Sequence, residues 1–311
     1  MTAHQLTFRE LLARFSDEKD CKAFLEFKRW PDGVIKCPRC SGKAFKLASR
    51  PFHYVCKSGA QHIDKRTGEV LTCSKNGYRF SVLTRTVFEN TNIKLRDWFK
   101  VIFLMFHSKK GMSALQIHRM LGTGSYETAW FMCHRIRAAM RGDAFPLTGE
   151  VEVDETFIGG KQKNRHASVR AKYSGGGAAH TGKVTVIGAI ARKGNVVAQV
   201  IENTSAETLS RFVETAVADK VTLIATDEYV GYTDLKHFYP HQTVDHKAHE
   251  YVRGNVHTNN IESFWSLLKR GVIGTYHNVS KEYLPLYLNE FSFRFNNRKN
   301  PDIFDEIIAG C

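Results

Sequence analysis

The stretch EVEVDETF (150–157) alternates polar and apolar residues as far as an aspartate, Asp154. Alternation with a period of two is typical of a β-strand with one buried face. A second short apolar run, VTLIA (221–225), is followed by Thr226 and Asp227. The pattern therefore predicts two strands, each of which leads into an aspartate at the point where the chain leaves the sheet.

The rest of this half of the chain alternates between strands and helices. The runs 184–191 and 196–201 are predicted to form a β-hairpin, because Lys193-Gly194-Asn195 between them is a turn signal. Helices are predicted over about 205–217 and over 260–269. Three strands, a helix, a fourth strand and a later helix are the order of an α/β domain.

Three acids of this domain are candidate metal ligands. In α/β sheets, sites gather beyond the carboxyl ends of strands, so Asp154 and Asp227 are expected to face each other. Glu262 follows in the first turn of the next helix. Carboxylates suit Mg²⁺ or Mn²⁺, and two such ions about 4 Å apart serve phosphoryl transfer. Singly, an aspartate at a strand end is usually a turn or cap residue, but the trio in this order favours catalysis.

Lys269 lies seven residues after Glu262, two helical turns along the same face. It could reach a phosphate beside the acids. It could equally be a solvated lysine on a helix whose other face is buried.

The chain of 311 residues is strongly basic, with 45 Lys and Arg against 31 Asp and Glu and a formal net charge of +14. This balance favours a nucleic-acid partner, because cations neutralise phosphates and release counterions. No apolar run approaches the roughly 20 residues that span a bilayer, and Met1–Glu10 has no signal-peptide core. We therefore expect a cytoplasmic protein that does not contact membranes.

Four of the seven cysteines lie within 37–73. Cys37-Pro-Arg-Cys40 is a knuckle that can give two thiolates to one tetrahedral zinc ion. Cys56 and Cys73 are the candidates for the second pair, although they lack the usual Cys-x-x-Cys spacing. We predict a structural zinc site in a zinc ribbon. His53 or His62 could replace one cysteine, and the alternative is a metal-free loop with free thiols.

Residues 91–148 show helical periodicity. Helices are predicted over about 95–106, over 114–121 and over about 126–140, with a glycine-containing turn at 122–125. This arrangement fits a helix-turn-helix or a plain three-helix bundle. Basic residues on the last helix favour DNA; they are His134, Arg135, Arg137 and Arg141.

Six cations and no acid occupy the stretch from Lys161 to Lys183, directly after the first candidate acid. We predict a loop that grips DNA phosphates beside the site. The alternative is a solvated excursion between strands.

Several long motifs resemble one family. The segments VEVDETFIGGK (151–161), ATDEYVGY (225–232) and EYVRGNVHTNNIESFWSLLKRGVIGTYHNVS (250–280) are similar to the catalytic core of bacterial insertion-sequence transposases related to the eukaryotic Merlin elements. Four shorter segments resemble the same family: RWPDG (29–33), FSVLTRTVFENT (80–91), GMSALQIHRMLGTGSYETAW (111–130) and FSFRFNNR (291–298). Arg85 stands where relatives often have glycine, and Asn260 where threonine is more usual.

The resemblance implies an RNase H-like fold and metal-dependent strand transfer of the DDE type. Asp154 matches the first catalytic acid and Asp227 the second. The third role, which family members give to Glu or Asn, falls within HTNNIE (257–262). We favour Glu262, because a carboxylate binds cations better than an amide and because Lys269 follows at the spacing of related enzymes. Asn259, one helical turn earlier, is the competing candidate.

Four ranges are predicted to form the units of the chain: an N-terminal helical segment (1–30), a zinc ribbon (31–90), a helical DNA-binding region (91–148) and an RNase H-like catalytic domain (149–311). The expected function is a transposase that acts on the terminal inverted repeats of its element and on target DNA, as a homo-oligomer, with two Mg²⁺ or Mn²⁺ ions. A domesticated DNA-binding regulator without catalysis and a nuclease that only cleaves are the alternatives.

Overall fold

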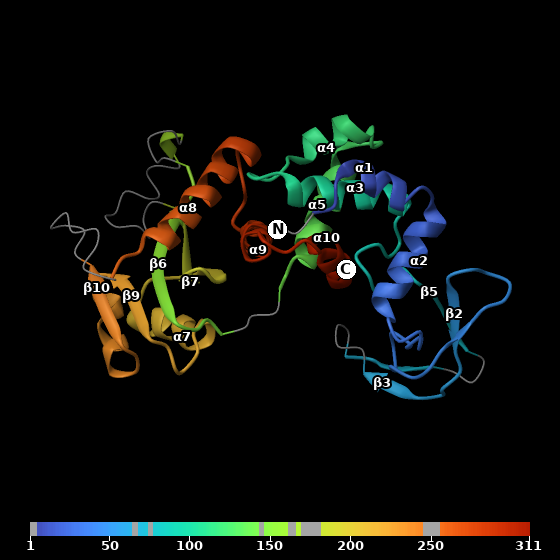
Figure 1. Cartoon of the computed structure of the whole chain (residues 1–311), viewed down its shortest axis with the longest axis horizontal. Coiled ribbons are helices and arrows are strands. Elements are labelled where there is room, and N and C mark those ends of the chain that lie inside the picture. Colours follow the sequence, from blue (N-terminus) through green and yellow to red (C-terminus); the bar gives the residue numbers. More distant parts are fainter. Residues whose placement is uncertain are drawn as a thin grey trace. The chain divides into compact units, whose positions relative to one another are not determined.

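The computed structural model describes residues 5–63, 68–73, 77–142, 146–160, 166–168, 182–244 and 256–311. The chain forms two compact units (Figure 1). The first contains Met1–Ser108, Ala114–Met140 and Asn300–Cys311, and the second contains Lys109–Ser113 and Arg141–Lys299. The C-terminal segment therefore packs with the first unit, whereas the sequence placed it in the range 149–311.

Helices α1 (Phe8–Arg14) and α2 (Glu18–Arg29) open the first unit. Each begins at a capping box, in which the cap side chain and an acid three residues later satisfy each other's backbone amides: Thr7 with Glu10, and Asp17 with Asp20. These caps give the N-terminal stretch the helical structure that its apolar pattern predicts.

An aromatic core joins the helices of the first unit. Phe15 packs against Phe99 of α3 (Leu95–His107) at a centroid distance of 4.8 Å, and against Phe304 of α10 (Ile303–Gly310) at 5.7 Å. Four residues of α10 are buried, and they are Ile303, Phe304, Ile307 and Ile308. Burial of this apolar face holds the last helix in the first unit. The unit also contains α4 (Ala114–Leu121) and α5 (Tyr126–Ala139).

The cysteine-rich part of the first unit contains two small antiparallel sheets. One has the order β1 (Phe45–Lys46), β2 (His53–Cys56), β5 (Tyr78–Ser81), and the other pairs β3 (Gln61–Ile63) with β4 (Val70–Thr72). In the described part of this region, the packed rings of Trp30, Tyr54 and Phe80 form an apolar core.

Arg85 adopts a φ of 60°, in the left-handed region that favours glycine. Its guanidinium donates a hydrogen bond of 2.8 Å to the carbonyl of Pro38. The glycine that relatives often have at this position therefore fits the backbone better, and the arginine adds a contact to the cysteine knuckle.

The second unit is built on a mixed five-stranded sheet of order β10-β9-β6-β7-β8. The strands β6 (Glu150–Ile158), β7 (Val184–Ala191) and β8 (Val196–Ile201) run antiparallel in succession. On the other side of β6, β9 (Leu223–Asp227) and β10 (His241–Val244) are parallel to it and to each other. The predicted hairpin and fourth strand are confirmed, and β10 is a further strand that the sequence analysis missed.

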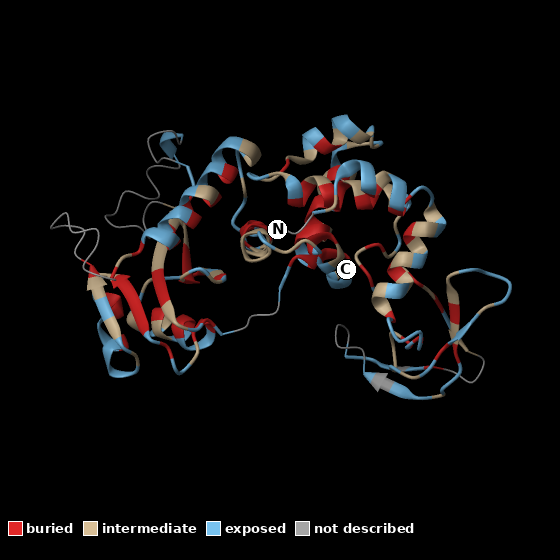
Figure 2. Ribbon diagram, viewed as in Figure 1, coloured by how far each residue is buried: buried red, intermediate tan, exposed pale blue. Residues whose placement is uncertain are grey.

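The two faces of this sheet are covered by different helices (Figures 1 and 2). Helix α7 (Ala206–Ala216) packs against one face, where the cluster includes Val151, Val153, Ile187 and Ile224. Helices α8 (Asn259–Gly271) and α9 (Leu284–Asn296) cover the other face, where they contact Val186 and Ile190. Because side chains alternate along a strand, the even-numbered residues of β6 and β7 face α8.

Two short helical segments complete the second unit. The 3₁₀ helix η3 (Val230–His237) follows β9, and the π-helical turn η4 (Val272–Tyr276) extends α8. Within the described ranges of the chain, no helix combines the length and the apolarity needed to cross a bilayer.

Candidate active site and metal centre

Asp154 lies inside β6 and not at its end. The strand continues to Ile158, and Asp154 pairs with Gly188 of β7, so the prediction that the strand ends at this acid is wrong. The β-favouring residues Thr156, Phe157 and Ile158 extend the antiparallel pairing. The parallel pairing with β9 stops earlier, at Glu152 opposite Ala225.

Asp227 is the last residue of β9, as predicted. It follows Ala225 by two residues, as Asp154 follows Glu152, so the parallel register brings both acids to the same edge of the sheet. The backbone amide of Tyr229 donates a hydrogen bond of 3.1 Å to one carboxylate oxygen of Asp227.

The electrostatics of Asp154 agree with acids that lie close together. Burial, together with the nearby charges of Glu155 and Asp227, raises the pKa of Asp154 to about 7. Hydrogen bonds from the backbone amide of Glu155 and from Trp265 oppose this shift. Like charges in a poorly solvated place favour a bound cation, which would stabilise the ionised carboxylates.

Glu155 is a second acid that the sequence analysis did not single out. Its pKa is raised, chiefly by burial and also by the charge of Asp227, and the Tyr232 hydroxyl donates a hydrogen bond that lowers it. Tyr232 is buried in the cluster on the α7 face of the sheet. The acidic pair DE in VEVDET was the available signal for this residue.

Glu262 and Lys269 line one cleft together with Asp154. The cleft has a volume of about 720 Å³, and Glu262 and Lys269 face it from the same side of α8, as their spacing predicts. Three acids and three cations are among its lining residues: Asp154, Glu155, Glu262, Lys110, Lys269 and Arg270. Lys110 and Arg270 were not anticipated from the sequence.

The two candidates for the third ligand differ in position. The Glu262 carboxylate accepts a hydrogen bond of 2.9 Å from the Thr258 hydroxyl and lines the cleft. Asn259 is exposed at the start of α8 and is not among the residues that line the cleft in the described part of the chain. This geometry favours Glu262.

Trp265 fixes α8 against the strand that carries Asp154. Its indole Nε1 donates a hydrogen bond of 3.0 Å to Oδ2 of Asp154. Gly188, opposite Asp154 in β7, leaves room for the ring, because a Cβ added there would lie 2.6 Å from Cη2 of Trp265.

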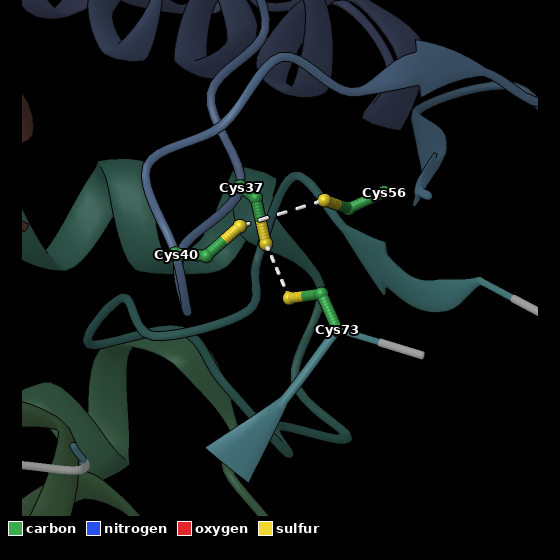
Figure 3. Close-up of side chains that lie close together, drawn as sticks. All are labelled: Cys37, Cys40, Cys56 and Cys73. Atoms are coloured by element: carbon green, nitrogen blue, oxygen red, sulfur yellow. Dashed lines mark hydrogen bonds between the residues drawn. The ribbon is translucent and has the colours of Figure 1, made fainter. Parts of the chain in front are cut away.

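The four predicted zinc ligands lie together in the first unit. Figure 3 shows their sulfur atoms pointing toward one another. The Sγ atoms of Cys37 and Cys73 are 3.6 Å apart, as are those of Cys40 and Cys56, and all four lie within 4.8 Å of one another. A tetrahedral zinc ion with Zn–S bonds of about 2.3 Å needs sulfurs about 3.8 Å apart, so the arrangement fits zinc.

The thiols of this cluster differ in their acidity. Burial raises the pKa of Cys37 and of Cys73. At Cys40 burial acts in the same direction, but hydrogen bonds led by that of Ser58 lower the pKa to about 6. His53 is not a member of the group, and its Nδ1 lies 2.9 Å from the carbonyl oxygen of Pro51. The side chain of His62 lies outside the described part of the chain.

Helices α4 and α5 occur where predicted, and Ser125 caps α5, because its Oγ accepts a hydrogen bond of 3.2 Å from the backbone amide of Thr128. The basic residues of α5 do not form the expected surface. His134 and Arg137 are buried, and Arg135 donates a hydrogen bond to the carbonyl of Glu89. Arg141, just beyond the helix, is exposed. His134 and Arg137 therefore serve packing, which removes two of the four basic residues on which the DNA interpretation of α5 rested.

The basic stretch predicted to grip DNA is Lys161 to Lys183. Apart from residues 166–168, Gly182 and Lys183, it lies outside the described residues.

Comparison with known proteins agrees with this arrangement. Residues 146–296 match the ISXO2-like transposase domain, and residues 16–60 match the transposase zinc-ribbon domain. A Halobacterium salinarum protein described as an uncharacterized protein in transposable element ISH50 is 26% identical over 289 residues, which cover 90% of this chain and 91% of that protein.

These matches define a chain with a transposase zinc ribbon followed by a transposase domain. They confirm the resemblance to insertion-sequence transposases. The match to the ISXO2-like transposase domain includes all three candidate acids.

Proposed function

We propose that this protein is the DNA transposase of an insertion element, which cuts and rejoins DNA strands with two Mg²⁺ or Mn²⁺ ions held by Asp154, Asp227 and Glu262. One observation carries the proposal: the first two acids reach the same edge of the sheet, and Glu262 enters the cleft of Asp154 from α8. Oxygen ligands in a poorly solvated cluster suit such ions.

The reaction has two stages in one site. Water first hydrolyses the phosphodiester at the element's end, and the freed 3′-hydroxyl then attacks a phosphodiester of the target, releasing the target's own 3′-hydroxyl. When bound, the metal ions would supply activation of the attacking oxygen and stabilisation of the leaving oxygen. Lys110, Lys269 and Arg270 provide positive charge along the cleft for the DNA phosphates. For Asn259, one helical turn before Glu262, we keep only an assisting role, because it does not line the cleft in the described part of the chain.

We assign an RNase H-like fold to the second unit. Its support is the sheet order, in which three antiparallel strands are followed by two strands parallel to the first, with helices on both faces. Functionally, the ranges 31–90, 91–148 and 149–299 correspond to the zinc ribbon, a helical DNA-binding region and the catalytic core, and the ribbon's Cys37, Cys40, Cys56 and Cys73 hold a structural zinc ion.

DNA recognition is assigned to the ribbon, to the α4–α5 helix-turn-helix and to the basic stretch 161–183. The partners are the element's terminal inverted repeats and the target DNA. Because two element ends are processed together, the active form is a homo-oligomer on DNA. The regulator is less well supported, because all three candidate acids are present and two of them, Asp154 and Glu262, line one cleft. A cleavage-only nuclease would use the same acids, and the joining assay distinguishes it.

A strand-transfer assay tests this function. Purified protein, Mg²⁺ or Mn²⁺ and labelled element ends should give cleaved and joined products, which vanish in Asp154→Asn, Asp227→Asn and Glu262→Gln and persist in Asn259→Ala. Cleavage without joining would identify a nuclease. DNA binding without cleavage in either metal would identify a regulator. Loss of products in Asn259→Ala but not in Glu262→Gln would move the third ligand to Asn259.

A further inference from the structure

Glu152 is a charged residue in the interior of the second unit. It precedes Asp154 by two residues in β6, so both side chains project from the same face of the sheet, and it is 0% exposed. A buried carboxylate is costly unless it is paired and hydrogen-bonded. Its partners therefore show what this residue does.

The carboxylate of Glu152 caps helix α8 from the neighbouring strand. Its Oε2 accepts hydrogen bonds from the backbone amides of Asn260 at 2.8 Å and Ile261 at 3.1 Å. Its Oε1 accepts a further bond of 2.7 Å from Nδ2 of Asn260. The first amides of a helix have no intrahelical partner and carry partial positive charge, so an anion stabilises them.

The residue at the helix start does not provide this cap. Thr258 makes no side-chain hydrogen bond to the amides of α8, and its hydroxyl donates instead to Glu262. Asn260, which departs from the threonine more usual in relatives, contributes its amide group to the bond with Glu152. The start of α8 is therefore held by a residue of the sheet.

Arg192 completes the network. Its Nε donates a hydrogen bond of 3.0 Å to Oε1 of Glu152, and its Nη2 donates one of 3.3 Å to the carbonyl of His257, just before α8. Nδ1 of His257 also lies 3.1 Å from Oε1, although not aligned for a good hydrogen bond. Arg192 thus balances the buried charge and ties the segment that enters α8 to the same point.

This network links two of the three acids through short, rigid segments. Asp154 is two residues beyond Glu152 on β6, and Glu262 is one residue beyond Ile261 on α8. Any shift of α8 relative to β6 changes the spacing of the two carboxylates. Resting on the function proposed above, we infer that Glu152 is a positioning residue that sets this spacing and thereby the affinity of the site for divalent cations.

The test measures cation binding without DNA. Tb³⁺ serves as the probe, because its luminescence is sensitised by a nearby indole and Trp265 is hydrogen-bonded to Asp154. Glu152→Gln should weaken Tb³⁺ binding about 10-fold or more, the usual range for partners that orient metal ligands. Asn260→Ala leaves the two backbone hydrogen bonds to Glu152 and should weaken Tb³⁺ binding less. This variant replaces Glu152→Gln in the test if Glu152→Gln does not fold.

Glu150→Gln is the matched control. Among the described residues, Glu150 pairs with the same Arg192 and makes no hydrogen bond to α8. It should bind Tb³⁺ within about twofold of the wild type, with melting temperatures compared for all variants. Unchanged affinity in folded Glu152→Gln and Asn260→Ala, or an equal loss in Glu150→Gln, would overturn the inference. If Asp154→Asn leaves the wild-type signal intact, the proposed metal site itself fails, and the positioning role with it.

Discussion

The indole nitrogen of Trp265 donates a hydrogen bond of 3.0 Å to Oδ2 of Asp154, so helix α8 is fastened directly to the first acid. The contact exists because the register partner of Asp154 is Gly188, over which the indole ring lies. This hydrogen bond and the cap that Glu152 gives to α8 both hold the helix close to the sheet. The arrangement of the acids therefore depends on that close packing.

Replacing Gly188 should damage both stability and activity. In Gly188→Ala the new Cβ would lie 2.6 Å from Cη2 of Trp265 and 3.2 Å from Cδ1 of Ile261, so α8 must move outward. Overpacking of this kind costs about 1–3 kcal/mol, and it also separates Glu262 from Asp154. We expect urea unfolding to show that loss and the cleavage assay to lose most activity. Gly160→Ala, where nothing lies within 4 Å, is the control; equal stability of both variants would contradict the packing argument.

The raised pKa of Asp154 predicts how stability depends on pH without divalent cations in the site. Because burial raises this pKa to about 7, above the usual value of 3.8, the native state binds more protons than the unfolded chain between these values. Its contribution to stability is therefore present at low pH and is lost as pH rises toward 7. The amide introduced by Asp154→Asn does not titrate, so this variant should be more stable than the wild type at pH 8, by at most about 4 kcal/mol, and similar at pH 4.

Hydrogen exchange of the β6 amides at both pH values measures this difference within the second unit. Buffers without chelator keep zinc in the ribbon. Added Mg²⁺ should stabilise the wild type and not the variant, because the ion binds only the native site. The exposed Asp219→Asn is the control. If the wild type is as stable as Asp154→Asn at pH 8, the ionised Asp154 carboxylate does not destabilise the native state, and the prediction is wrong.

Local signals in the sequence predicted much of this fold. The hairpin 184–201 and the bounds of α4 follow from turn residues and helical periodicity, and the short spacing of Cys37 and Cys40 indicated half of the cysteine cluster. The strand β10 was missed because HQTV (241–244) is short and has no apolar alternation. Lys110 was missed because it enters the cleft from a segment distant in sequence, which only the tertiary fold brings to α8.

Two predictions were wrong because they depended on tertiary contacts that local sequence patterns do not contain. Asp154 was placed at a strand end because the alternation was followed only as far as the acid, whereas pairing with β7 extends the strand to Ile158. The basic residues of α5 were expected on the surface, but helical spacing does not say which face the bundle buries. Arg137 is only 2% exposed, so a charged residue of this helix lies on its buried face.

Removal of Cys73 should abolish zinc binding. Cys73 lies beyond the matched ribbon range 16–60, yet its Sγ is 3.6 Å from that of Cys37. Cys73→Ser should therefore reduce zinc, measured by elemental analysis, from one ion per chain to near zero and unfold the ribbon, because structural zinc contributes folding energy directly. Cys21→Ala, which removes a buried thiol outside the cluster, should retain its zinc. Full zinc content in Cys73→Ser would exclude it from the ligand set.

The lysines that line the cleft should contribute to the salt dependence of DNA binding. Lys110 and Lys269 line the same cleft as Asp154 and Glu262, so a phosphate held beside the acids would contact them. Each contact that is lost should flatten the slope of log K against log salt by about 0.9, whatever the DNA sequence. We expect Lys110→Ala and Lys269→Ala to weaken binding to element ends and to unrelated DNA alike, with both slopes reduced. Lys220→Ala, an exposed lysine outside the cleft, should keep the wild-type slope. If Lys269→Ala also keeps that slope while cleavage is lost, Lys269 acts on the reacting phosphate and not in holding the DNA.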